Sequence, residues 1–74
     1  MATQIFTAVY EQQDDWWAAW VEELPGANSQ GRTIEEAREN LKEAVELILE
    51  VNREIANEQT AGRQVIREPI TISV

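Results

Sequence analysis

The sequence predicts a single α+β domain over residues 1–74, with the element order β-β-β-α-β. Two stretches rich in β-branched and aromatic residues come first, a capped amphipathic helix follows, and a β-branched segment ends the chain. A chain of 74 residues buries only roughly 60% of its extended surface, so it holds one core and gains from burial against a partner.

The first two strands are expected at Gln4–Glu11 and Trp16–Leu24, joined by a hairpin turn through the polar residues 12–15. Side chains of the second strand alternate between its two faces, and the residues on both faces are largely apolar. One helix covers only one of these faces. We therefore expect one face of the sheet to remain for a partner. One face carries Trp16, Ala18, Trp20 and Leu24, and the other carries Trp17, Ala19 and Val21.

A Pro-Gly pair, Pro25 and Gly26, ends the second strand, because proline donates no ladder hydrogen bond and glycine tolerates the turn. Residues 27–30 then predict a short third strand before Gly31. Two glycines ahead of a helix can cradle a phosphate. However, neither the Walker spacing nor G-x-G-x-x-G is present, so we interpret Gly26 and Gly31 as turn residues.

A long amphipathic helix is predicted from Ile34 to about Asn57. Thr33 is its N-cap, and Glu36 completes a T-x-x-E capping box. Such a helix is about 36 Å long, whereas a compact domain of this size is roughly 30 Å across. Either the helix ends early, or its last turns rest on another chain through Val51 and Ile55. The apolar seam comprises Ile34, Ala37, Leu41, Ala44, Ile48, Val51 and Ile55, with Val45 and Leu49 beside it.

Seven glutamates at steps of three and four form an acidic stripe on the side of this helix opposite the seam. The stripe is either a solvated face or a docking surface for a basic partner, and the sequence leaves both open. The stripe comprises Glu35, Glu39, Glu43, Glu46, Glu50, Glu54 and Glu58.

The C-terminal segment Val65–Val74 is predicted as a final strand, separated from the helix by Gly62. Pro69 places that strand at a sheet edge or at a bulge. Ile70 and Ile72 join Val51 and Ile55 as candidate contacts in a homodimer or higher homo-oligomer.

Composition excludes much chemistry. The net charge is −8, from 14 acidic and 6 basic residues, and such a field repels nucleic-acid backbones, so we expect no direct DNA binding. The absence of cysteine and histidine removes disulfides, thiolate nucleophiles, imidazole bases and the usual zinc ligands. We expect no enzyme activity, metal or cofactor. No membrane span or secretory signal is recognisable, so a cytoplasmic location is expected.

The aromatic residues are the strongest candidates for a partner-binding site, because large apolar patches mark interaction surfaces. We expect Phe6 and Tyr10 to lie beside Trp16 and Trp20 across the hairpin. For either set of aromatics, a core role and an interface role remain equally open. Nearby acids would steer a basic partner, and the candidate steering charges are Glu22, Glu23 and the helix glutamates.

Residues 5–50 resemble the HicB antitoxin family. Its members run from a hairpin through a Leu-Pro-Gly turn and a Gly-x-Thr pair into a Glu-Glu-Ala helix start and an L-x-E-A-x-x-L repeat. The matching positions here are Leu24, Pro25, Gly26, Gln30, Gly31, Thr33, Glu35, Glu36, Ala37, Leu41, Glu43, Ala44 and Leu47.

The resemblance implies a partial ribonuclease-H-like fold without ribonuclease activity. It also implies a role as the antitoxin of a type II toxin–antitoxin pair, covering a small, basic, HicA-like toxin that cleaves messenger RNA. Many members carry a further DNA-binding segment. None is recognisable up to Val74, which puts operator binding in doubt. The alternative is an orphan structural or regulatory homo-oligomer with no toxin partner.

Overall fold

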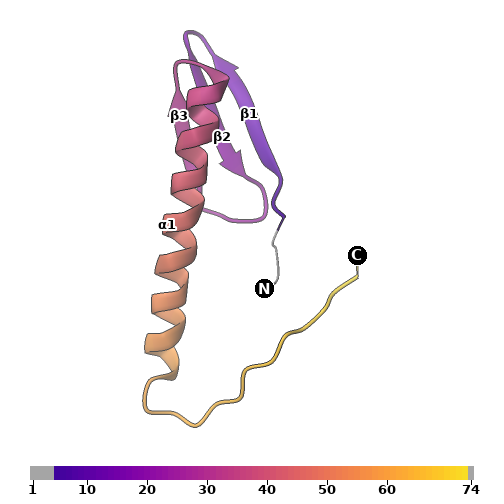
Figure 1. The fold of residues 1–74 in the computed structure, drawn as a ribbon, viewed down its shortest axis with the longest axis vertical. Coiled ribbons are helices and arrows are strands. Elements are labelled where there is room, and N and C mark those ends of the chain that lie inside the picture. The colour runs from indigo at the N-terminus through magenta and orange to yellow at the C-terminus, as the bar shows by residue number, and fades with distance from the viewer. Residues whose placement is uncertain (1–4, 74) are drawn as a thin grey trace.

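A three-stranded antiparallel sheet packs one face against a single long helix in the computed structural model, which describes residues 5–73 (Figure 1). The α+β class and the long helix are confirmed. The third strand is present one residue later than predicted. The elements are β1 (Ala8–Gln13), β2 (Trp16–Val21), β3 (Asn28–Gly31) and α1 (Ile34–Thr60), and the sheet order is β1-β2-β3.

The hairpin between β1 and β2 has a tighter turn than expected. Gln13 pairs with Trp16, so only Asp14 and Asp15 form the turn. Asp14 has a φ of 54°, a left-handed conformation that aspartate tolerates better than most residues. The two-residue turn lets β1 run on to Gln13, whereas we predicted its end at Glu11.

The first turns of α1 dock closely on β3. The Ser29 hydroxyl donates to the Ala37 carbonyl at 2.8 Å, and the Asn40 side-chain amide donates to the Gln30 carbonyl at 2.8 Å. A Cβ built on Gly31 would lie 2.6 Å from the Ala37 backbone nitrogen. Gly31 is therefore the last residue of β3, needed for close approach, and its interpretation as a turn residue is wrong. Gly26, with a φ of 92°, is the turn residue that we predicted.

Helix α1 begins at the predicted N-cap, but of the two hydrogen bonds of a capping box only one is present among residues 5–73. The Glu36 backbone N–H donates to the Thr33 hydroxyl at 3.1 Å, and Thr33 itself is extended. Glu35 and Glu36 lie in the first turn, where acids interact favourably with the helix dipole. At the other end the helix runs three residues past Asn57, and Gly62 follows with a φ of 73°.

The core is built from small side chains. No large side chain is fully enclosed among the described residues. Burial of so little apolar area stabilises a domain weakly, because each Å² contributes only about 25 cal/mol. The buried residues are Ala19, Val21, Ala27, Ala37 and Leu41, with Phe6, Tyr10, Trp17, Leu24, Val45 and Ile48 packed partly against them.

The second half of α1 extends past the sheet (Figure 1). Ile48 is still half-buried and lies near Gly26, but Val51 and Ile55 are exposed. The radius of gyration is 15.7 Å, compared with roughly 11 Å for a compact chain of this length. The helix does not end early, so its last turns present apolar side chains that nothing in residues 5–73 covers.

The predicted C-terminal strand is absent: residues 64–73 carry no regular secondary structure, and Val74 lies outside the described residues. The long helix ends well beyond the sheet, so the segment that follows it has no neighbouring strand with which to form hydrogen bonds. A β-branched sequence pattern alone does not supply such a partner. Pro69 further lacks the N–H that a central strand would need.

Substitution of Gly31 by alanine should destabilise the fold by about 1–3 kcal/mol, because the methyl group forces α1 away from β3. Urea unfolding followed by tryptophan fluorescence measures the change. Gln30→Ala, on the exposed face of the same strand, is the control and should change stability by at most about 0.5 kcal/mol. Equal costs for the two variants would contradict the close-packing role.

Thr33→Ala should cost about 1 kcal/mol, because it removes the acceptor of the Glu36 N–H, and Thr33→Ser should retain most of the stability. Thermal unfolding followed by circular dichroism at 222 nm compares the two variants. Loss of stability in the serine variant equal to that in the alanine variant would show that the hydroxyl cap is unimportant.

Candidate protein-interaction site

Strand register places the aromatic residues on two opposite faces of the sheet. Val9 pairs with Trp20 and Gln13 with Trp16, whereas Tyr10 pairs with Ala19. The helix covers the face of Ala19, and no other helix or strand of residues 5–73 covers the opposite side of the sheet. Our expectation of one leftover face is therefore confirmed. We call it the outer face, and its residues are Val9, Glu11, Gln13, Trp16, Ala18, Trp20, Asn28 and Gln30.

Phe6 and Tyr10 do not lie beside Trp16 and Trp20, as we had expected. They lie on the helix side, because Tyr10 shares a face with its partner Ala19 and packs partly against the core. The four aromatic candidates thus belong to two separate surfaces.

The outer face has an apolar centre and a mixed edge. Trp16 is 42% exposed, and Trp20 and Val9 are half-buried. The Arg32 guanidinium lies 5.2 Å from the centroid of the Trp16 ring, which holds one side of the indole by a cation–π contact. The carboxylate of Glu11 follows on the same face. The arrangement suits docking of a partner with apolar anchors and basic surroundings.

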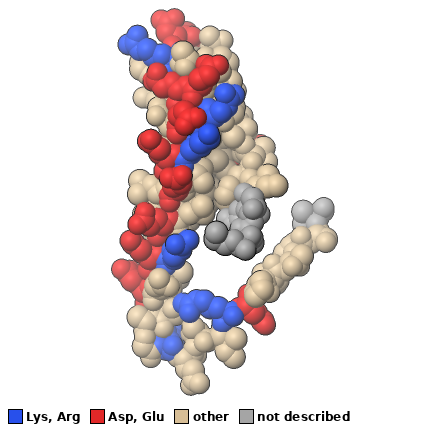
Figure 2. Space-filling view, viewed as in Figure 1, with Lys and Arg blue, Asp and Glu red and all other residues tan. Residues whose placement is uncertain are grey.

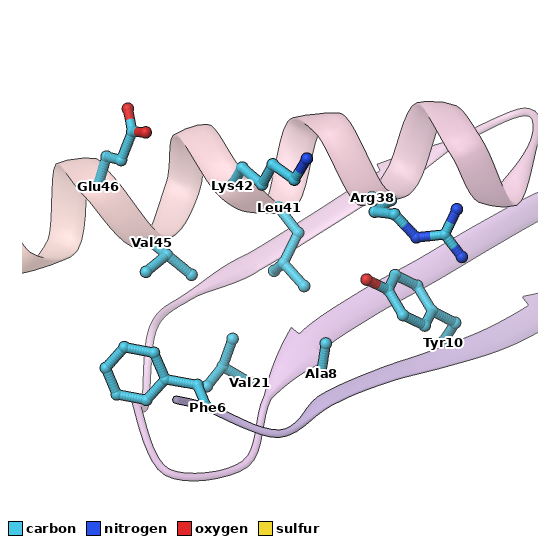
Figure 3. A pocket seen from close by; sticks show the side chains of 9 residues that line it. All are labelled: Phe6, Ala8, Tyr10, Val21, Arg38, Leu41, Lys42, Val45 and Glu46. Atoms are coloured by element: carbon cyan, nitrogen blue, oxygen red, sulfur yellow. The ribbon is translucent and has the colours of Figure 1, made fainter. Parts of the chain in front are cut away.

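On the helix side, an inner groove opens between β1 and α1, because the helix packs mainly over β3 and β2. Its volume is about 440 Å³. Figure 3 shows Leu41 and Val45 pointing from the helix toward the sheet, with Arg38 beside Tyr10. The Arg38 guanidinium lies 5.4 Å from the centroid of the Tyr10 ring. The residues lining the inner groove are Phe6, Ala8, Tyr10, Val21, Arg38, Leu41, Lys42, Val45 and Glu46.

Glu22 and Glu23 flank the end of β2 but differ in surroundings. The Glu22 backbone N–H donates to the Thr7 carbonyl at 3.0 Å, which extends the ladder beyond Val21. The Glu23 carboxylate accepts from the Thr7 hydroxyl at 2.6 Å and from the Thr7 N–H at 2.7 Å. These hydrogen bonds, the hydroxyl first, lower the pKa of Glu23 below its ordinary value. Glu23 is therefore tied to its own chain, and Glu22 is the freer steering charge.

Leu24 departs from the face that alternation predicted. Because β2 ends at Val21, Leu24 lies in the turn and packs partly against the core. The Leu24 N–H donates to the Val21 carbonyl at 3.4 Å, and the Ala27 N–H donates to the Leu24 carbonyl at 3.2 Å. The conformation of this turn, rather than strand pleating, decides where Leu24 points.

The acidic stripe of α1 is fully on the surface: every one of its seven glutamates is exposed. Figure 2 shows acidic side chains following the helix, with basic ones interspersed. The only salt bridge among residues 5–73 joins Lys42 to Glu39 at 3.3 Å. Within the same residues, no three acidic side chains converge as a metal site would require.

The oligomer candidates are all accessible. Val51 and Ile55 are exposed on the helix, and Ile70 and Ile72 are exposed in the C-terminal segment. Thr7, Arg32 and Arg38 also belong to these surfaces, although no pattern in the sequence predicted them. Their roles depend on contacts between elements, for which the local sequence carries no signal.

The Leu-Pro-Gly turn, the closely packed Gly31 and the capped helix all lie within the part of the chain that known proteins share. The profile of the UPF0150-like family matches residues 2–56. The chain belongs to the UPF0150-like family. The match covers the sheet and most of α1, and residues 57–74 lie beyond it.

Relatives of this UPF0150-like chain come from distant organisms. A UPF0150 protein of Archaeoglobus fulgidus is 36% identical over 62 residues, which cover 82% of this chain and 90% of that protein. One from Synechocystis is 50% identical over 46 residues, covering 60% of this chain and 62% of that protein. One from Thermotoga maritima is 41% identical over 49 residues, covering 64% and 65%.

No solved structure matches the chain significantly. In the described part of this UPF0150-like chain, the one helix is too polar to cross a membrane.

The Thr7–Glu23 contact should make stability depend on pH. Because the folded pKa of Glu23 is lowered, its contribution is present above the unfolded pKa and is lost as pH falls through the folded pKa. Thr7→Val should raise the Glu23 pKa and flatten the acid side of the stability profile, whereas Thr7→Ser should preserve both. NMR titration of the Glu23 side chain measures the shift, and an unchanged pKa in Thr7→Val would contradict the assignment.

Proposed function

We propose that this UPF0150-like chain is the antitoxin of a type II toxin–antitoxin pair and that it neutralises a small, basic, HicA-type ribonuclease by covering it. The outer face of the sheet supplies the docking surface. Trp20 and Trp16 are its apolar anchors, and Glu11, on the same face, and Glu22, which directly follows β2, are its steering acids.

The observation that carries this proposal is the uncovered apolar outer face on a strongly acidic chain. Indole rings near the centre of an interface contribute more to binding than most other side chains. Trp16 is 42% exposed although it belongs to a strand, so a partner could cover it without rearrangement of the fold.

The charge distribution supports a basic partner. A net charge of −8 on 74 residues attracts a cationic protein and accelerates encounter, mainly through the association rate. The exposed stripe on α1 adds to this field along the length of the helix. The sequence resemblance to HicB antitoxins supports the same assignment and specifies the toxin class.

Isothermal titration of this chain with a small, basic, HicA-type ribonuclease tests the proposal. We expect a stable complex that suppresses RNA cleavage. Trp20→Ala should weaken binding at least about tenfold, equivalent to about 1.4 kcal/mol. Glu22→Lys should lower the association rate, with a larger effect at low salt.

Glu58→Lys, near the far end of α1, is the matched charge control and should have a smaller effect on the association rate. Absence of a complex at micromolar concentrations, or unchanged affinity in both Trp20→Ala and Glu22→Lys, would defeat the assignment.

A second candidate is a structural or regulatory homo-oligomer without a toxin. The exposed Val51 and Ile55 favour it, because the extended end of α1 has no cover within residues 5–73. Self-association that persists while no toxin binds would support this alternative.

A further inference from the structure

Strand β1 has a free hydrogen-bonding edge. The Thr7 carbonyl accepts from the Glu22 N–H, so the backbone groups of Thr7 point toward β2. Antiparallel ladders alternate, so Val9 and Glu11 also point toward β2, whereas the backbone groups of Ala8 and Tyr10 point away from it. Since β1 is at the edge of the sheet, those outward groups have no strand partner among residues 5–73.

The inner groove lies alongside this free edge. Ala8 and Tyr10 alternate onto its floor, and Leu41 and Val45 form the helix wall (Figure 3). A strand added to β1 would place every second side chain over the groove, because side chains in a strand alternate between faces. The site therefore fits an extended peptide with apolar residues two apart.

The C-terminal segment has that pattern. Ile70 is 82% exposed and Ile72 is 67% exposed, and the polar Thr71 lies between them. Pro69 stands just before the pair, where a strand tolerates proline. Glu68 is two residues before Ile70, so its side chain lies on the same face of the segment as those of Ile70 and Ile72. In the docked segment Glu68 would lie at the end of the groove that carries the basic residues.

We propose that residues 68–73 of a second copy of this chain dock as an added strand on β1, with Ile70 and Ile72 in the inner groove. The groove is lined by two basic residues, Arg38 and Lys42, and one acid, Glu46, and Lys42 also pairs with Glu39 at 3.3 Å. Arg38, which lies over the Tyr10 ring, is therefore the main attraction for Glu68 of the incoming segment. Exchange in both directions gives a symmetric dimer, each groove receiving the other copy's segment. This pairing uses the groove and β1, not the outer face, so it does not depend on the proposed toxin.

The long helix is the reason why a second copy, rather than the same chain, supplies the strand. From Glu46 at the groove to Thr60, α1 runs about 21 Å at 1.5 Å per residue. From Arg63, after the turn, Ile70 reaches back at most about 23 Å at 3.3 Å per residue. Packed layers are also about 10 Å apart, so even a fully straight segment brings Ile70 of the same chain only to the near end of the groove.

Glu68 of the same chain lies at most about 17 Å from Arg63 and stops short of Glu46. It therefore cannot meet Lys42 or Arg38, whereas the segment of a second copy can enter from the other end. In Figure 1 the segment of the same chain turns back from the end of α1 but runs separately from both the helix and the sheet.

The test is sedimentation velocity of the full chain over a range of concentrations. We expect a dimer whose dissociation constant rises at least about tenfold in Ile70→Glu/Ile72→Glu, because charges replace both buried apolar side chains. The matched control, Thr71→Glu/Ser73→Glu, adds the same charges to the other side of the segment and should change the constant no more than about threefold. All four positions are exposed in the protomer, so the fold itself should tolerate these variants.

A mixing experiment tests both sides of the contact. Ala8→Arg fills the groove, and this variant should be monomeric alone, as should Ile70→Glu/Ile72→Glu. Mixed together, one supplies an intact segment and the other an intact groove, so a dimer should reappear. Gln12→Arg, on the same strand but outside the groove lining, is the control and should remain dimeric.

Three results would overturn the proposal. The first is a wild-type chain that is monomeric at 100 μM, a concentration of about that order being ample for a specific interface. The second is a dimer that Ile70→Glu/Ile72→Glu leaves intact, which would assign association to another surface. The third is a mixture of the two monomeric variants that stays monomeric.

Discussion

The close approach of the first turns of α1 to β3 is the contact on which the rest of the molecule depends. It requires a glycine at position 31, because any Cβ there would collide with the backbone of Ala37. Ser29 and Asn40 then fix the helix by hydrogen bonds across the same contact. Small residues permit this distance, and side chains the size of leucine at Ala19 or Ala27 would not fit beneath the helix.

This contact decides which surfaces remain for partners. By seating α1 over β3 and β2, it covers one apolar face and leaves the other open, with β1 half-uncovered at the edge. A core of three alanines, one valine and one leucine encloses little area. Binding of a partner to either surface would stabilise the fold by mass action, since partners that bind only the folded state favour it.

The two uncovered surfaces differ in charge, which suits them to different partners. The outer face carries Glu11 near its tryptophans and Arg32 beside Trp16, whereas the inner groove is bordered by two basic residues, Arg38 and Lys42, and one acid, Glu46. A basic protein is attracted to the former and an extended apolar segment with an acidic residue to the latter. Because they lie on opposite sides of the sheet, both could be occupied at once.

The sequence by itself determined the features that depend on neighbours along the chain. The Thr33 cap, the Pro-Gly turn at Gly26, the acidic stripe and the excess of apolar strand surface all follow from local chemistry and periodicity. Tertiary structure alone decided which face of the sheet the helix covers. It also decided that Phe6 and Tyr10 lie on the face opposite the two outer tryptophans, and that Gly31 permits close packing of the helix. It also left residues 65–73 without a strand partner, despite their β-branched pattern. The physical reason is that the sequence of a strand shows which residues share a face, but not which of its two faces will be covered. Contacts between elements distant in the chain choose between them.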